Sequence, residues 1–180
     1  MELLKRITDK DITGADRICR NEPRRVVRAV LLDENDQVAV LYIGKCNFYI
    51  LPGGGIEDGE KPEQALRREA LEETGCRCEI VRELGIVEEN GASRDYFEKS
   101  YCYLARVVGE KGALNLTEEE TLEDTRLEWH GIYRAADLIK KQECPDYEMK
   151  FSVMRDGVLM DEVLRNIIPV PHVGGGAKKI

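Results

Sequence analysis

Three carboxylates on one face of an expected helix are the first feature of this chain that suggests chemistry. Glu69, Glu72 and Glu73 stand at i, i+3 and i+4, a spacing that places Cβ atoms roughly 5–6 Å apart on a helix. Like charges at this spacing repel each other. A hard divalent cation reverses the effect, because Mg²⁺ and Mn²⁺ favour carboxylate oxygen. The pattern predicts a metal site, with a solvated acidic face as the alternative.

The elements that must position these carboxylates are a helix and a glycine-rich stretch before it. Pro62 suits a helix start, because proline fits the first turn, and Gly75 suits the end, because glycine tolerates the left-handed conformation common there. Glycines at 53–55 precede Glu60. They allow tight turns, and a loop that leads into a helix can present N–H groups to an anion. Loop and helix together predict a metal held near a phosphate.

A fixed spacing links these parts. Gly54 is followed after five residues by Glu60, and after seven more by the run 68–76, which reads REALEETGC. This spacing resembles the signature of the Nudix hydrolases, G-x5-E-x7-R-E-U-x-E-E-x-G-U, where U is an apolar residue. Every charged and glycine position matches, with Ala70 and Cys76 at the two U positions. The resemblance covers residues 54–76, which we call the box.

The resemblance implies an activity, a cofactor and a fold. The activity is metal-dependent hydrolysis of a diphosphate linkage in a nucleoside diphosphate joined to another group. The cofactor is Mg²⁺, for which Mn²⁺ can substitute, and the partner is a small-molecule nucleotide substrate. The fold is α/β, a Nudix-like α/β/α sandwich with a mixed β-sheet, which agrees with the order of strands and helices along the chain.

Roles for the charged residues follow from the resemblance, position by position. Glu69, Glu72 and Glu73 are the expected metal ligands. The first and last are the more usual direct ligands in the family, and one of the three can act as the base instead, so Glu72 is also a catalytic candidate. Glu60 and Arg68 are expected to support catalysis, with Glu60 near the metal and Arg68 oriented by a carboxylate. A surface salt bridge of little energetic worth is the alternative for Arg68.

Backbone groups and a distant carboxylate would complete such a site. The Gly54 carbonyl is expected to help seat the metal, and the Gly55 backbone to bind substrate. Nudix enzymes often recruit one more carboxylate from the loop before a late strand, and the acidic run 117–124 offers several. We expect Glu123 to serve and place Glu120 second. A solvated acidic loop is the alternative for this run.

The substrate is less sharply indicated by the sequence. Tyr96 can stack on a base, a contact worth about 1–3 kcal/mol, and Arg94 can meet a phosphate. A core position for Tyr96 and an exposed loop position for Arg94 are the alternatives. Many ADP-ribose hydrolases carry a proline about sixteen residues after the box, where Gly91 and Ala92 stand here. A nucleotide sugar, such as ADP-ribose, or a nucleoside triphosphate is the expected substrate.

Two other functions stay open. The domain can be a nucleotide-binding sensor that kept the fold and lost turnover, although the intact glutamates argue against this. It can also be an RNA 5′-end pyrophosphohydrolase. A net charge of −8 argues against that alternative and against a DNA partner, since nucleic-acid binding relies on a basic footprint.

Composition narrows the class of protein. The 180 residues, 42% hydrophobic and 34% charged, are typical of one globular domain. No run approaches the roughly 18 apolar residues of a membrane span, so no membrane partner is expected. The six cysteines are expected to be reduced thiols packed as small apolar side chains. We expect a cytoplasmic protein. Homodimerisation is common in the family, and a homodimer stays open.

The order of patterns along the chain predicts one main domain. Residues 1–21 form an N-terminal segment of unknown role, 22–168 the Nudix hydrolase domain and 169–180 a mobile tail. Apolar and β-branched runs predict strands at 24–32, 37–43, 77–88, 96–108 and 126–132, with the first two paired as a hairpin. Polar residues predict a loop at 89–95. Helical spacing predicts helices between Lys61 and Gly75 and at 133–141 and 147–167.

Overall fold

The structure, a computed structural model, describes residues 1–144 and 146–167. Its strands are β1 (Leu3–Thr8), β2 (Arg24–Leu32), β3 (Gln37–Ile43), β4 (Phe48–Ile50), β5 (Arg77–Gly91), β6 (Tyr96–Val108) and β7 (Thr125–Gly131). Its helices are α1 (Asp9–Ile12), α2 (Pro62–Thr74), the 3₁₀ turn η1 (Ala92–Arg94), α3 (Glu118–Leu122), α4 (Ile132–Lys141) and α5 (Tyr147–Ile167). The predicted tail at 169–180 lies outside the described residues.

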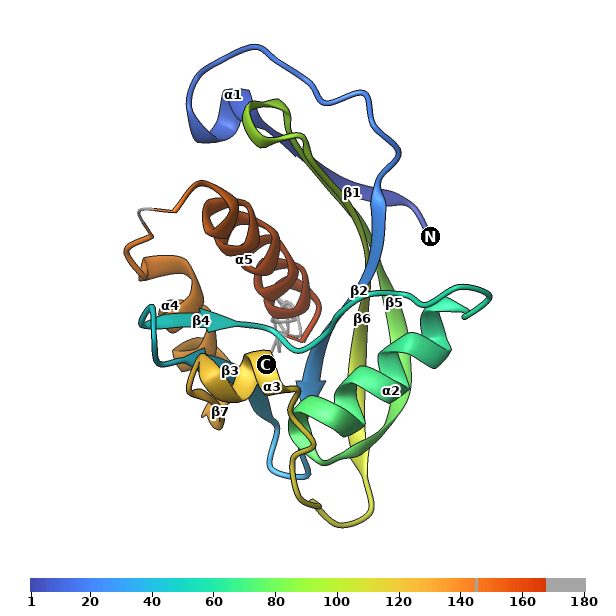
Figure 1. Cartoon of the computed structure of the whole chain (residues 1–180). Helices are drawn as coiled ribbons and strands as arrows, with labels where there is room; N and C mark the ends of the chain where they lie inside the picture. Colours follow the sequence, from blue (N-terminus) through green and yellow to red (C-terminus); the bar gives the residue numbers. More distant parts are fainter. Residues whose placement is uncertain (145, 168–180) are drawn as a thin grey trace, which may run out of the picture.

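The seven strands form one mixed sheet in the order β1-β5-β6-β2-β3-β4, with β7 paired to β3. β2 runs parallel to β6 from Arg24↔Glu98 to Leu32↔Arg106, and β1 runs parallel to β5. The predicted hairpin of β2 and β3 is wrong over most of its length, because the two strands meet only at Leu32↔Val38. β3 instead pairs along its length with β7, so the sheet splays open beside β2 (Figure 1).

The free edge of β2 is occupied by the loop that opens the box. This box loop (residues 51–56) runs alongside β2, where Ala29 N donates to Pro52 O at 2.9 Å and Val27 N donates to Gly54 O at 2.9 Å. Farther along, Ile56 N donates to Arg25 O at 3.0 Å. The hydrogen bonds that a hairpin partner would have made therefore hold the glycines of the box in place.

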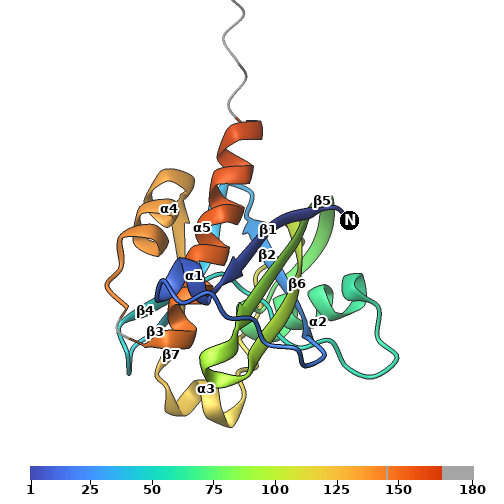
Figure 2. The same ribbon diagram turned by 90° about the horizontal axis from the view of Figure 1, so that it is seen from above.

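Helices cover both faces of the sheet, as Figures 1 and 2 show from two directions. The apolar side of α2 packs on one face, against alternate residues of β2 and β6; this cluster includes Ala65, Leu66, Ala70, Val27, Ala29, Leu31, Tyr103 and Ala105. The opposite face packs against α5 in a second cluster, which includes Phe151, Leu159, Met160, Val163, Val30, Val87 and Leu104. The predicted α/β/α arrangement with a mixed sheet is confirmed.

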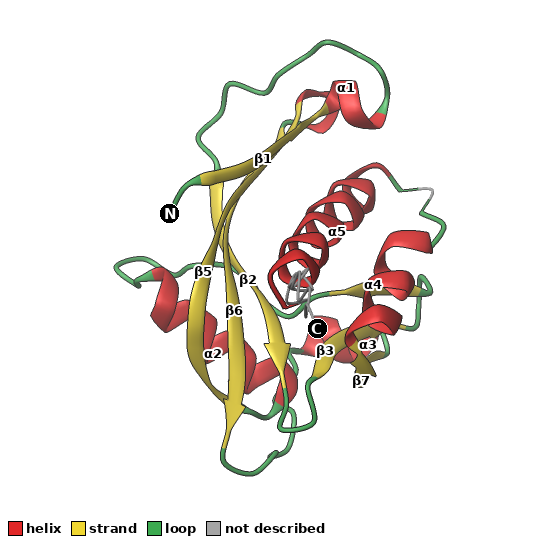
Figure 3. Cartoon of the chain, turned by 180° about the vertical axis from the view of Figure 1, so that it is seen from behind, coloured by secondary structure: helices red, strands yellow, loops and turns green. Residues whose placement is uncertain are grey.

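The N-terminal segment, to which the sequence assigned no role, is part of this sheet. β1 pairs with β5 from Leu3↔Ile86 to Thr8↔Asn90, and α1 follows it directly (Figure 3). β5 is also longer than predicted, because its pairing with β6 continues to Gly91↔Tyr96. Glu89 and Asn90 are polar but buried, so the polarity that predicted a loop at 89–95 reflects hydrogen bonding inside the core.

The sequence also predicted free, buried cysteines and no membrane-spanning segment. All six cysteines are free, and four of them, Cys19, Cys76, Cys78 and Cys102, are buried as expected. Among residues 1–144 and 146–167, no helix combines the length and apolar character needed to traverse a membrane.

Candidate active site

The box loop and α2 are shaped by their sequence to face each other. Pro62 opens α2, and Gly75 ends it in the left-handed conformation, with φ 65° and its N–H donating to Leu71 O. Gly53 has φ 140°, and a Cβ there would overlap the Val27 carbonyl oxygen. Only glycine fits this position against β2. The turn brings the backbone of 53–55 beneath the carboxylates of α2.

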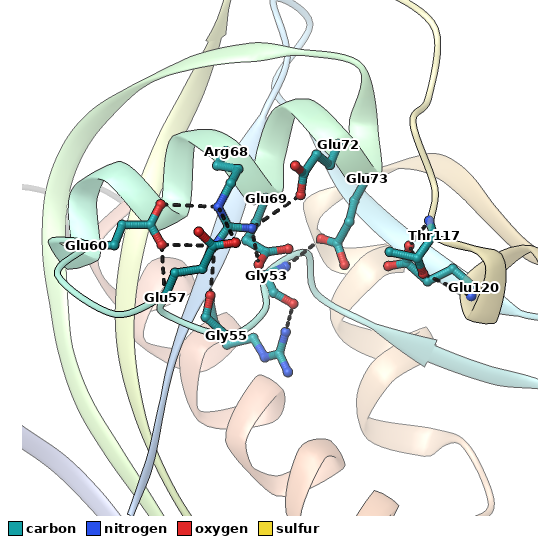
Figure 4. A network of polar contacts seen from close by, with 11 residues as sticks. Gly53, Gly55, Glu57, Glu60, Arg68, Glu69, Glu72, Glu73, Thr117 and Glu120 are labelled. Atoms are coloured by element: carbon teal, nitrogen blue, oxygen red, sulfur yellow. Dashed lines mark hydrogen bonds and ion pairs between the residues drawn. The ribbon is translucent and has the colours of Figure 1, made fainter.

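Arg68 lies at the centre of the charged side chains (Figure 4). Its Nε and Nη2 donate to the two oxygens of Glu60 at 3.2 and 3.0 Å, and Nη2 also donates to the Gly55 carbonyl at 2.8 Å. Its Nη1 donates to Glu69 at 2.8 Å and to Glu72 at 3.3 Å. Hydrogen bonding to Arg68 lowers the pKa of Glu60, and the same contact raises the pKa of Arg68. The predicted pairing of Glu60 with Arg68 is present, and it ties α2 to the box loop.

Glu73 is the most deeply buried carboxylate of the box. Its side chain accepts a hydrogen bond from Gly53 N at 2.7 Å. Burial raises its pKa to about 8, against the opposing effects of Arg28 and of the Gly53 N–H. Burial also raises the pKa of Glu69, which Arg68 opposes. Glu69 lies directly against the loop, since a Cβ on Gly54 would lie 2.5 Å from its carboxylate.

The donor set can be tested against the predicted metal. In the part of the chain that the structure describes, no three His, Cys, Asp or Glu side chains are grouped closely enough to hold a metal ion. Arg68 engages Glu69 and Glu72, and Gly53 N engages Glu73. The Gly54 carbonyl accepts from Val27 N and keeps one lone pair. The donors are all oxygen, and the buried Glu73 carboxylate lacks a direct cationic partner within that described part. The chemistry of the donors therefore fits a hard cation, whereas their present spacing would have to close around one.

The two carboxylates proposed from the acidic run lie in different surroundings. Glu120 extends toward the box (Figure 4), and its charge contributes to the raised pKa of Glu73. Glu123 instead adds to the raised pKa of the Cys46 thiol, where burial is the main cause. Glu120 also accepts from Thr117 N and Oγ1 at 2.7 and 2.8 Å, a capping box that explains why a helix forms in this run. Between the two candidates, the geometry favours Glu120.

Two of the three residues predicted to bind substrate, Arg94 and Tyr96, line one cavity of about 440 Å³ beside the start of β2, and Gly55 does not. Arg94 pairs with Asp146 and Glu148, each at 3.5 Å. The Tyr96 ring packs 5.3 Å from that of Phe151, and its hydroxyl donates to Glu89 at 3.3 Å. Both side chains are therefore engaged by the protein on one side and face the cavity on the other.

This cavity borders the box loop through Arg24. The Arg24 guanidinium, which also lines the cavity, lies 3.4 Å from where a Cβ of Gly55 would stand. Its Nη1 donates to Glu98 at 3.0 Å. Arg94 and Tyr96 therefore share a cavity, and Gly55 lies outside it with Arg24 between them.

Arg28 is a candidate that the sequence interpretation missed. It lies on β2, its Nη1 donates to the Gly53 carbonyl, and its charge lowers the pKa values of both Glu69 and Glu73 against the effect of burial. The signal was present in the sequence, because an arginine interrupts the apolar run VVRAVLL. A charge inside a buried strand rarely stands there without a partner.

Comparison with known proteins identifies the family. A profile described as NUDIX domain matches residues 22–149, well over half of the chain. The chain belongs to the Nudix family. The family profile thus includes the box, the paired strands β2 and β6, and most of the elements that position the box.

Curated relatives match a shorter part of this Nudix protein. The 8-oxo-dGDP phosphatase NUDT18 of Mus musculus is 38% identical over 108 residues, which are 58% of this chain and 31% of that protein. The diphosphoinositol polyphosphate phosphohydrolase 3-beta of Homo sapiens is 33% identical over 96 residues, 53% of each protein. The chain thus spans about a third to a half of the length of these relatives.

Solved structures agree on the fold. A UDP-X diphosphatase has a TM-score of 0.55 at 17% identity, covering 86% of this chain and 68% of that one. A Nudix hydrolase from Nitrosomonas europaea has a TM-score of 0.53 at 22% identity, covering 76% and 90%. At such identities the likeness concerns the fold alone, and it agrees with the mixed sheet and its covering helices.

Proposed function

We propose that this Nudix protein is a metal-dependent hydrolase that cleaves a diphosphate linkage in a nucleoside diphosphate derivative. The observation that carries the proposal is the buried Glu73 carboxylate, held against Gly53 N–H beside Glu69 and the arginine-centred cluster. Family membership and the phosphatase and phosphohydrolase names of the relatives support a pyrophosphohydrolase. The intact set of box glutamates favours an enzyme over a nucleotide-binding sensor.

Each box residue has a distinct task in this proposal. Glu69, Glu72 and Glu73 would hold Mg²⁺ or Mn²⁺, with the Gly54 carbonyl. When bound, the ion supplies charge neutralisation for the phosphate oxygens and lowers the pKa of a water. Glu72 has the most exposed side chain of these three glutamates, at 38%, and is the best placed to accept a proton from water. Arg68 holds the helix and the loop in register.

The charges that line the cavity of Arg24, Arg94 and Tyr96 indicate which group can be attached to the diphosphate of the substrate. Its lining includes four carboxylates, on Glu22, Asp95, Glu98 and Glu148, and two guanidiniums, on Arg24 and Arg94. An inositol ring with several phosphates would meet net repulsion there. A nucleoside has no charge at neutral pH and would stack on Tyr96 or Phe97, the aromatic residues of the lining. The cavity therefore supports a nucleoside diphosphate derivative rather than a diphosphoinositol polyphosphate.

A hydrolysis screen tests the proposal. The protein is incubated with Mg²⁺, Mn²⁺ or a chelator and with nucleoside di- and triphosphates, nucleotide sugars, a diphosphoinositol polyphosphate and a triphosphorylated RNA. Product masses then identify the bond that is cut. We expect metal-dependent turnover of a small nucleotide that Glu73→Gln abolishes. Nucleotide binding without turnover would instead support the sensor, and preferred turnover of the RNA would support a 5′-end pyrophosphohydrolase. The cytoplasmic location and the homodimer remain predictions.

A further inference from the structure

A buried ionic network joins α5 to the sheet and to the box loop. Its members are Glu89 on β5 and Arg155 and Asp156 on α5, and each is at most 1% exposed. Arg155 Nη1 donates to Glu89 Oε1 at 3.3 Å, and Arg155 Nε donates to Asp156 Oδ1 at 2.8 Å. The other oxygen of Asp156 accepts from Leu51 N at 2.9 Å. The network thus ends on the backbone of the box loop.

The last of these contacts completes a set of three on one short segment. Leu51 lies two residues before Gly53, whose N–H donates to Glu73 on α2 and whose carbonyl accepts from Arg28 on β2. The segment is therefore held from α2, from β2 and from α5. Of these three elements, α5 lies almost entirely beyond residue 149, where the family match ends.

Stability alone does not explain this arrangement. Removing charges from water is costly, and replacing a buried ion pair with apolar residues of similar size is often neutral or stabilising. Burial lowers the pKa of Arg155, but Asp156 and Glu89 together raise it well above its ordinary value, so the side chain stays charged. Its Nη2 has no hydrogen-bond partner within residues 1–144 and 146–167. An apolar core could pack α5 here, but it could not accept the Leu51 N–H.

We propose that Asp156 and Arg155 are positioning residues for the box loop: Asp156 binds the Leu51 N–H, and Arg155 fixes the Asp156 carboxylate between the sheet and the loop. The catalytic consequence rests on the proposed function, because the loop carries Gly54 and Gly55 toward the reacting groups. The structural consequence, a loop held by α5, does not depend on it.

Hydrogen exchange tests the structural part without any substrate. Asp156→Ala removes both acceptors, and Asp156→Asn keeps the size but can accept only one of the two hydrogen bonds. Leu159→Ala is the matched control, since it creates a cavity in the same helix and the same core cluster but removes no hydrogen bond to the loop. We expect amide exchange across residues 48–56 to rise about tenfold or more in Asp156→Ala and by less in Asp156→Asn, because local opening becomes easier. Leu159→Ala should leave this segment protected. Equal exchange in all four proteins would overturn the proposal.

Kinetics on folded protein test the catalytic part. With the folded fraction matched by circular dichroism, we expect kcat to fall about tenfold in Asp156→Ala with a smaller change in KM, since misplacing a site by about 1 Å can cost 10²-fold. Asp156→Asn should recover part of the loss, and Leu159→Ala should stay within twofold of the parent. An equal loss in Leu159→Ala would reduce Asp156 to a packing role and refute the inference. If the parent protein hydrolyses nothing, the proposed function fails while the exchange result still decides the loop contact.

Discussion

Two buried carboxylates of this chain show opposite behaviour. Asp33, in the turn between β2 and β3, accepts from Asn35 N and Gln37 N at 2.9 Å each and from Lys111 Nζ at 2.7 Å. Burial alone would raise its pKa, but these contacts hold the pKa below its ordinary value of 3.8. Glu73, in the box, accepts from Gly53 N at 2.7 Å, and burial raises its pKa to about 8.

The contrast separates a structural carboxylate from a functional one. Both side chains are nearly inaccessible to solvent, although Glu73 lies deeper among protein atoms, so low exposure alone marks neither. Asp33 has two N–H donors from its turn and a matching charge from Lys111, which leaves nothing for a ligand to supply. Within residues 1–144 and 146–167, Glu73 has the Gly53 N–H as a donor and no cation in direct contact, and this deficit is what a divalent cation would correct. The predictions below test whether that deficit is the basis of activity.

The largest expected effect belongs to Glu73→Gln. The amide keeps the size of the side chain and can still accept from Gly53 N, but it removes the charge. We expect kcat/KM with saturating Mg²⁺ to fall by about 100-fold or more, on the scale of lost metal-site interactions, with an unchanged far-ultraviolet spectrum. Activity within threefold of the parent would mean that the metal lies elsewhere.

Gly54→Ala should come next. The added Cβ would stand 2.5 Å from the Glu69 carboxylate, whereas the same change at Gly55 meets its nearest atom, on Arg24, at 3.4 Å. We expect Gly54→Ala to lower kcat about tenfold by displacing Glu69, and Gly55→Ala to cost less. Steady-state kinetics of the two variants side by side measure the difference. A larger loss of kcat in Gly55→Ala than in Gly54→Ala would contradict the prediction, because it would mean that the close approach of Gly54 to Glu69 does not govern activity.

Glu120→Gln should have a moderate effect that Glu123→Gln lacks. Glutamine can replace glutamate in a capping box, so the change removes the charge near Glu73 while α3 stays capped. We expect kcat to fall about five- to tenfold in Glu120→Gln and less than twofold in Glu123→Gln. Both changes are smaller than the roughly 10²–10³-fold cost of losing a direct contact to the transition state, because Glu120 acts through its charge near Glu73. Identical kinetics in the two variants would remove this run from the site.

The sequence predicted the local parts of this molecule well. Helix α2, its glycine end and the spacing of Glu69, Glu72 and Glu73 are encoded within a few turns, so periodicity and capping suffice to find them. The long helix at 147–167 and the strand at 24–32 were predicted for the same reason.

The missing parts depend on contacts between distant segments. The free edge of β2 takes the box loop instead of β3, a choice made by hydrogen bonds across the fold that no local pattern records. Glu89 was assigned to a polar loop and Arg28 was given no role, yet each is held by a partner from a distant segment. Glu123 was preferred to Glu120 from spacing alone, before the short helix α3 turned Glu120 toward the box.

Asp33→Asn should have the smallest effect on catalysis and a measurable one on stability. The amide oxygen can keep both backbone N–H contacts, while the amide nitrogen faces Lys111 and loses that contact. Because Lys111 is partly exposed, at 35%, we expect a loss of about 1 kcal/mol in the free energy of unfolding at pH 7. This corresponds to a decrease of roughly 2–4 °C in Tm, with kcat within twofold of the parent.

The pH dependence gives the sign of this effect. The folded-state pKa of Asp33 lies below the value of 3.8 taken for the unfolded chain, so the ionised carboxylate stabilises the fold above that pH. The contribution disappears as the pH falls through the folded-state pKa. Urea unfolding at pH 7 and at pH 3 should therefore show a gap between parent and Asp33→Asn that narrows in acid. A gap that widens in acid would mean that burial, not hydrogen bonding, dominates at Asp33, and the contrast with Glu73 would no longer hold.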